Sequence, residues 1–161
     1  MNSQQVILII ITCLATAAVA SAQCSPKDYI DAHNTIRAEV GVGPMIWNET
    51  LAAYAQAYSE KRAPDCAIEH SQGPYGENLA SGSWDMSAKD AVDMWYDEKK
   101  LFDAVADKRI NENDMSYLHY TQIVWNTTTC VGCGKVTCAN GWTFITCSYD
   151  PPGNFIGECP F

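Results

Sequence analysis

His119 stands in the run "SYLHYTQIVW", residues 116–125, and is one of three histidines in a chain of 161 residues. An imidazole near neutral pH can transfer a proton, ligate a metal or hold a hydrogen bond, and a buried one without a partner is costly. The sequence contains no G-x-S-x-G elbow, no H-E-x-x-H run and no glycine-rich phosphate loop. Ser71 follows His70, but adjacency in sequence is not a nucleophile–base geometry. We therefore predict no catalytic residue from the motifs.

The eight cysteines form a second reactive group. Cys130-x-x-Cys133 looks like half of a redox or zinc motif, but the chain has no second such pair and no βαβ pattern around it. Cys13 falls in the leader described below, which leaves seven cysteines. In a secreted chain we expect these to form disulfides before metal sites. The odd number leaves at least one thiol free or paired with another molecule. The seven are Cys24, Cys66, Cys130, Cys133, Cys138, Cys147 and Cys159.

The amino-terminal segment predicts secretion. Val6 to Val19 is almost wholly apolar and leads to Ala20-Ser21-Ala22, which is typical of a signal peptide over residues 1–22 cleaved before Gln23. The remaining 139 residues, 23–161, suit one domain. No later stretch is apolar enough to span a bilayer, so we expect a soluble monomer. The net charge of −9 argues against nucleic acid and anionic lipid as partners.

Several elements must position these residues. Ser25, Pro26 and Asp28 predict the start of a first helix, with His33 on its inner face as a core histidine bonded to backbone. Asn48 predicts the cap of a second helix that Pro64 ends. Further helices are expected from Ser87 through Phe102 and, as a short helix or turn, within residues 116–125. Asn48 and Asn126 also begin N-x-T sequons and are glycosylation candidates.

The last third of the chain is rich in β-forming residues. "CVGCGKVTC" and "WTFITCSYD" flank Asn140-Gly141, which predicts a hairpin with a type I′ turn. Helices followed by antiparallel strands favour the α+β class.

Four stretches now resemble a known family. "HYTQIVWNTT" and "FITCSYDPPGNF" resemble the two signatures of the CAP superfamily, and "AHNTIRAEVGVGPMIWNETLAAYAQAYSEKRAPDC" and "GPYGENLASGSW" resemble its plant pathogenesis-related protein 1 branch. The resemblance covers essentially all of residues 23–161. It implies a three-layer α-β-α sandwich with an antiparallel sheet.

The resemblance also implies disulfides between Cys66 and Cys138 and between Cys133 and Cys147. The third bridge of the family cannot form, because "ADKRINENDMSYL" lacks the two cysteines that plant members carry upstream of the histidine. Leu118 also departs from the family, which usually has Gly, Asp, Glu or Arg there. Cys24 and Cys159 lie near the two chain ends, and we expect them to pair, with Cys130 as the odd thiol.

The family's central cavity maps onto His70, Glu77, Glu98 and His119. Two histidines with carboxylates suit zinc, so His70 and His119 are candidate ligands for a divalent ion, although no cofactor is required. A hydrogen-bonded network that ties loops to helices explains the same four residues. The nearby aromatic residues are expected mainly in the core, with a few lining a groove for lipid: Tyr75, Trp84, Trp95, Tyr96, Phe102, Tyr117 and Tyr120.

The function implied by the resemblance is non-enzymatic plant defence. We expect a secreted protein, in the apoplast or vacuole, that binds sterol or another lipid, acts against fungi or oomycetes, and has microbial proteins as further candidate partners. One alternative is a hydrolase that uses the four cavity residues. Another is a precursor that releases the peptide Pro151–Phe161 by cleavage after Asp150, where this chain reads "CSYD" and the plant pattern has Asn in place of Ser148. A structural tail explains the same segment.

Overall fold

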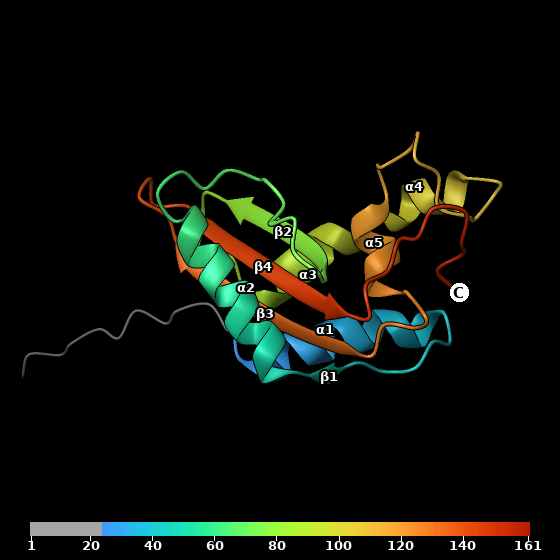
Figure 1. Ribbon diagram of the computed structural model, residues 1–161, viewed down its shortest axis with the longest axis horizontal. Helices are drawn as coiled ribbons and strands as arrows, with labels where there is room; N and C mark the ends of the chain where they lie inside the picture. Colours follow the sequence, from blue (N-terminus) through green and yellow to red (C-terminus); the bar gives the residue numbers. More distant parts are fainter. Residues whose placement is uncertain (1–23) are drawn as a thin grey trace, which may run out of the picture.

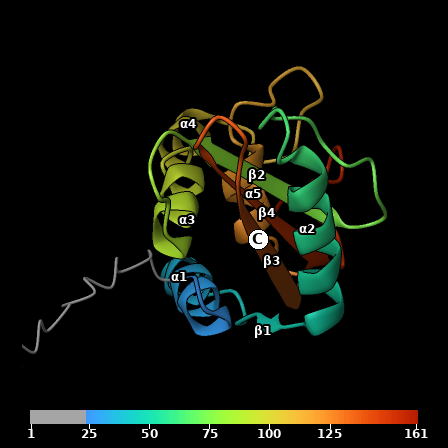
Figure 2. The same cartoon turned by 90° about the vertical axis from the view of Figure 1, so that its left-hand side faces the viewer.

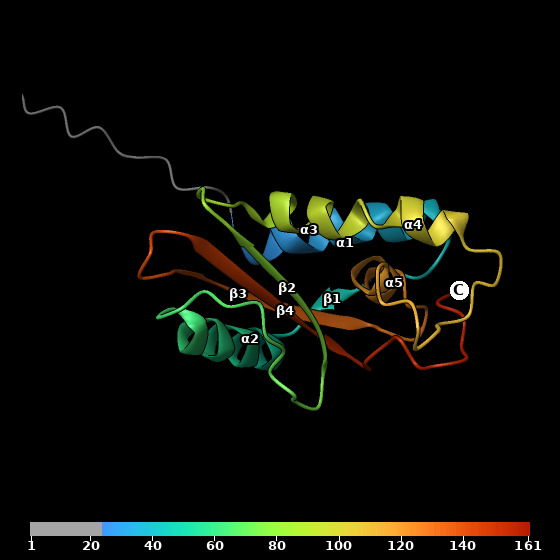
Figure 3. The same ribbon diagram turned by 90° about the horizontal axis from the view of Figure 1, so that it is seen from above.

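The computed structural model describes residues 24–161, so the predicted signal peptide and its cleavage before Gln23 lie outside the described residues. A four-stranded sheet in the order β1-β3-β4-β2 forms the middle layer (Figure 1). Helices α1, α3 and α4 cover one face of this sheet, and α2 covers the other (Figure 3). This arrangement confirms the α+β class and the three-layer sandwich.

The first two helices begin where their caps predict. In α1 (Pro26–Glu39), the Asp28 carboxylate accepts from the Ser25 backbone N–H at 2.8 Å, and the Asp28 N–H donates back to the Ser25 hydroxyl. In α2 (Glu49–Arg62), Asn48 accepts from the first backbone N–H groups of the helix. These bonds satisfy donors that a helix start leaves open.

His33 is the core histidine that the sequence predicts. Its ring is fully buried, with Nδ1 2.8 Å from the Tyr29 carbonyl oxygen and Nε2 2.9 Å from the Tyr149 hydroxyl oxygen. Both ring nitrogens are therefore satisfied inside the core. Burial lowers the pKa of His33 to about 4, so the ring stays neutral at physiological pH.

The prediction of a single third helix from Ser87 through Phe102 is wrong, because this segment forms two helices. α3 (Ala88–Tyr96) ends before Asp97, and α4 (Lys99–Ala104) begins after Glu98. The break lets the Glu98 side chain reach the next helix, α5 (Leu118–Ile123), while Trp95 stays anchored to the carbonyl of Leu79.

Most of the aromatic residues in this region lie in the core, as expected. The buried members are Trp95, Phe102, Tyr117 and Tyr120, whereas Tyr75, Trp84 and Tyr96 keep partial exposure.

The hairpin forms, but its turn is not the predicted type I′. β3 (Cys130–Thr137) and β4 (Thr143–Asp150) pair antiparallel, and β2 (Gly76–Gly82) pairs antiparallel with the other edge of β4. In the connection, Gly141 has φ +81° but Asn140 is not in the left-handed region, and the Cys138 N–H donates to the Trp142 carbonyl at 2.7 Å. That pattern is a three-residue loop with glycine in the left-handed position.

The sheet is not wholly antiparallel either. The two-residue strand β1 (Ile46–Trp47) pairs parallel with the start of β3.

Both disulfides implied by the resemblance form. Cys66 bonds Cys138 across a separation of 72 residues, and Cys133 bonds Cys147 between paired positions of β3 and β4. Cys130 is free, as expected.

The expected bridge between Cys24 and Cys159 is wrong, since both thiols are free. The start of α1 and the C-terminal end of the chain lie at opposite ends of the molecule (Figures 1 and 3). The Cys24 sulfur instead lies 3.7 Å from the Met86 carbonyl oxygen.

The C-terminal tail, residues 151–161, is bound along α5. The Asn154 amide donates to the Leu118 carbonyl at 2.8 Å and accepts from the Thr121 hydroxyl at 2.7 Å. The Asn126 N–H donates to the Pro160 carbonyl at 2.7 Å. These bonds support the interpretation of the segment as a structural tail, while its release after Asp150 stays a prediction.

Candidate functional site

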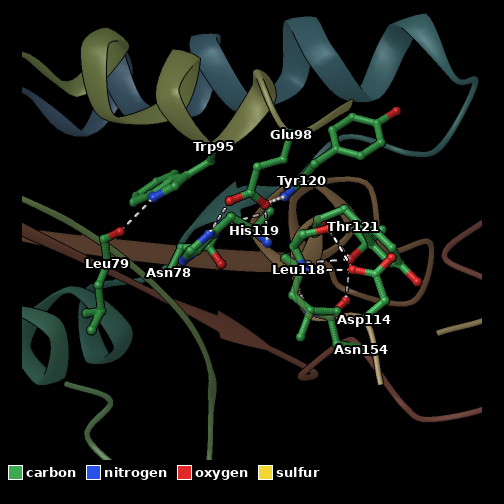
Figure 4. Close-up of polar contacts among 12 residues, drawn as sticks. Asn78, Leu79, Trp95, Glu98, Asp114, Leu118, His119, Tyr120, Thr121 and Asn154 are labelled. Carbon is green, nitrogen blue, oxygen red and sulfur yellow. Dashed lines mark hydrogen bonds and ion pairs between the residues drawn. The ribbon is translucent and has the colours of Figure 1, made fainter. Parts of the chain in front are cut away.

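His119 is held by one carboxylate from a different helix. Its ring Nδ1 lies 2.7 Å from Glu98 Oε1, and its backbone N–H donates to Glu98 Oε2 at 2.9 Å (Figure 4). The Tyr120 N–H donates to the same Oε2 at 3.3 Å. No side chain of the residue before α5 caps this helix. Glu98 therefore serves as the N-terminal cap of α5 and at the same time orients the imidazole.

The face of the His119 ring is also fixed. It stacks on the indole of Trp95, with ring centroids 6.4 Å apart and an interplanar angle of 19° (Figure 4). From the other side, the Asn78 amide donates to the His119 carbonyl at 3.0 Å and to the Tyr149 hydroxyl at 3.2 Å. Asn78 was missed from the sequence, although it directly follows Glu77 in the "GEN" run.

His70 and Glu77 form a second pair of the same kind. The His70 ring Nδ1 lies 2.8 Å from Glu77 Oε1, which also accepts from the Ser71 backbone N–H at 2.9 Å. The Glu77 side chain is 7 % exposed and the His70 side chain 52 % exposed. Glu77 Oε2 is buried without a hydrogen-bond partner. Because Glu77 is at the start of β2, next to Asn78, the edge strand links the two pairs.

The charges of the second pair stabilise each other. The hydrogen bond that His70 donates to Glu77 raises the pKa of His70, and burial opposes this shift. Burial alone raises the pKa of Glu77, but the hydrogen bonds from His70 and Ser71 outweigh it and lower that pKa. A protonated His70 is thus favoured by its partner.

The structure forms two His–Glu pairs, and within residues 24–161 it gathers no group of three or more metal-ligating side chains. Each ring uses Nδ1 toward its carboxylate, and neither Nε2 has a hydrogen bond within this part of the chain. That tautomer suits an imidazole that ligates through Nε2. A tetrahedral zinc site made by protein alone needs more ligands than two imidazoles. The residues fit weak ion binding with water completing the coordination, and they do not fit a closed structural site.

The other predicted site residues lie apart from these pairs. Asn48 caps α2 through its side-chain oxygen, and Asn126 is exposed beside the docked tail. Asp150, the residue before the candidate cleavage point, is exposed at the end of β4, and the Pro151 carbonyl accepts from the Thr128 hydroxyl at 2.8 Å.

The chain is similar to proteins of a known family. The model of the CAP family, described as the cysteine-rich secretory protein family, matches residues 30–149. The chain belongs to the CAP family. All four residues of the two His–Glu pairs lie inside the matched segment.

Plant relatives are similar over nearly the whole chain. The basic form of pathogenesis-related protein 1 from Nicotiana tabacum is 49% identical over 94% of this chain and 86% of its own length. A pathogenesis-related protein 1 from Arabidopsis thaliana is 47% identical over 96% of this chain and 94% of its own length. This CAP protein is of the pathogenesis-related protein 1 type.

Solved structures share the fold at lower identity. NaASP2, whose crystal structure was determined with Zn²⁺, has a TM-score of 0.72 and 21% identity and covers 84% of each chain. A hookworm platelet inhibitor has a TM-score of 0.69 and 23% identity over 84% of this chain and 74% of its own. In residues 24–161 of this CAP protein, no helix has the length and apolarity needed to cross a membrane.

Proposed function

We propose that this CAP protein is a secreted, non-enzymatic defence protein that binds a sterol or related lipid and thereby acts against fungi or oomycetes. The observation that carries the proposal is its similarity to plant pathogenesis-related proteins 1 along nearly the full chain. Two disulfides fit an oxidising compartment such as the apoplast or vacuole.

A cavity beside the tail supports the lipid part of the proposal. It has a volume of about 320 Å³ and lies between the loop of residues 105–114 and the tail. Its apolar wall comes from Val105, Ile110, Tyr117 and Ile156, and charged residues of the loop also line it. A largely apolar concavity with a few polar groups is the usual form of a small-molecule site. The side chain of Ile156 is largely exposed here, which suits a lipid that covers it on binding.

The loop of residues 105–114, which lines this cavity, lacks the cysteines of the plant pattern. A wall that is less preorganised costs binding free energy when it orders around a ligand. We therefore expect weaker sterol affinity than in a relative whose loop carries its disulfide.

The test is binding of radiolabelled sterol to the purified protein of residues 23–161. Ile156→Glu should abolish binding, because it places a charge in the cavity wall. Ile68→Glu is the matched control, since Ile68 is similarly exposed at 55 % against 59 % for Ile156 but does not line the cavity. Equal binding by both variants would exclude this cavity as the lipid site.

The same preparation separates a binding protein from a hydrolase. Sterol binding that survives His119→Ala supports the binding protein. Cleavage of a peptide library that is lost in His119→Ala supports the hydrolase instead. The precursor alternative is decided by mass spectrometry of secreted protein from challenged tissue. Since Cys159 is free, the peptide Pro151–Phe161 should be found without reductant if it is released.

A further inference from the structure

A larger cavity lies away from both His–Glu pairs, in the groove between α1 and α3. Its volume is about 620 Å³, within the range of small-molecule sites. The two helices lie side by side on the same face of the sheet (Figures 2 and 3). No residue of the His–Glu pairs lines this groove.

The floor of the groove is apolar and its walls are acidic. Ala32 and Ile36 of α1 and the ring of Tyr96 of α3 supply the apolar surface. Four carboxylates line the same groove, against a single cationic lining residue, Lys89. The carboxylates are Asp28, Asp31, Glu39 and Asp93.

Three of these carboxylates have side-chain partners at the surface, whereas Asp28 is held in the cap of α1. Asp31 pairs with Lys27, Asp93 pairs with Lys89 at 2.5 Å, and Glu39 accepts from the Tyr96 hydroxyl at 2.7 Å. Both ion pairs are between exposed i,i+4 neighbours, a class that contributes little to stability. A cationic ligand can therefore replace the lysines at little cost.

The carboxylates are spread along the groove. Asp28 and Glu39 are eleven positions apart on α1, which corresponds to about 16 Å along the helix axis. The field in the groove opposes an anionic lipid and favours several positive charges spaced along an aliphatic chain.

We propose that the α1–α3 groove binds a linear aliphatic polyamine, with methylene segments on the Ala32–Ile36 floor and ammonium groups at the flanking carboxylates. This inference is independent of the sterol cavity, because the two cavities share no lining residue.

Isothermal titration calorimetry with the tetra-amine spermine at low salt tests the proposal. Asp31→Asn, Glu39→Gln and Asp93→Asn together remove three carboxylates of the groove, while Asp28 is kept because it caps α1. The matched control removes three exposed carboxylates outside the groove by Glu60→Gln, Glu112→Gln and Glu158→Gln, with the same change in net charge. Dodecylamine and dodecanoate serve as single-charge probes of similar length.

We expect one saturable spermine site in the unmodified protein, with affinity about tenfold weaker in the groove variant and within about twofold in the control. Raising the salt concentration to 0.5 M, roughly three times the physiological value, should weaken spermine binding to the unmodified protein. An equal loss in both variants would show bulk charge attraction and overturn the proposal. So would the absence of saturable spermine binding, or binding of dodecanoate as tight as that of spermine. If circular dichroism shows that the triple variant is unfolded, Glu39→Gln alone is used, with an expected loss of about threefold.

Discussion

Replacing Glu98 by alanine tests whether one carboxylate both caps α5 and holds His119. The change removes the acceptor of the His119 and Tyr120 backbone N–H groups and of the His119 ring. Loss of a helix cap costs about 1 kcal/mol, and loss of the ring hydrogen bond about 1 kcal/mol more. The Glu98 side chain is only 22 % exposed, so water replaces these bonds poorly.

The expected loss is therefore about 2 kcal/mol in the free energy of unfolding, or a melting temperature lower by about 8 °C for a domain of this size. Thermal unfolding followed by circular dichroism measures it, and amide hydrogen exchange of His119 and Tyr120 should accelerate together. Glu98→Gln keeps one acceptor oxygen and should lose about half as much. Glu112→Ala, an exposed carboxylate elsewhere, should stay within about 0.5 kcal/mol of the unmodified protein. A Glu98→Ala melting temperature equal to that of Glu112→Ala would refute the capping role.

Three further outcomes are expected. Cys66→Ser should destabilise the domain by about 2–4 kcal/mol because its bridge closes a long loop, whereas Cys130→Ser should change little, as chemical denaturation of the two variants will show. Because burial holds the folded pKa of His33 at about 4, below its unfolded value of about 6.5, the unfolded chain binds the proton first. The His33 contribution, about 3 kcal/mol, is thus present above pH 6.5 and lost as pH falls toward 4. Chemical denaturation at several pH values across this range measures the contribution. If His33→Gln leaves the pH dependence of the free energy of unfolding unchanged, that dependence comes from another group. Zinc should bind weakly at His70 and His119, and its affinity should fall as the pH falls, because a metal ion binds only the neutral imidazole. Calorimetry that finds equal zinc uptake after both histidines are changed to alanine would exclude these ligands.

The local elements of this fold follow from short-range rules that the sequence displays. Ser25 with Asp28, Asn48 alone, and Ser87 with Asp90 each begin a helix with bonds inside one turn. The features that sequence reasoning missed depend on contacts between distant segments. The break before α4 accompanies the reach of Glu98 to α5, and β1 exists only because it pairs with β3.

The candidate site divides in the same way. Histidine and glutamate residues separated by 7 and 21 positions carry no pairing signal of their own, and only the family resemblance named them. The structure shows two pairs linked through β2, and the single cavity lined by all four residues that the resemblance implied stays a prediction. The roles of Asn78 and Trp95 around His119 depend on how β2 and α3 pack, which no local pattern encodes.

The bonds between the tail and α5 couple the predicted release of the peptide to the position of His119. Asn154 satisfies Leu118 and Thr121, at the start and middle of the helix that carries His119. A protease that removed residues 151–161 would take these partners with it and leave a six-residue helix held by Glu98, by the bond from Asn78 to the His119 carbonyl and by its buried side chains. Such a short helix has little stability of its own. Release of the peptide would therefore loosen the helix that positions His119 in every molecule that is cleaved.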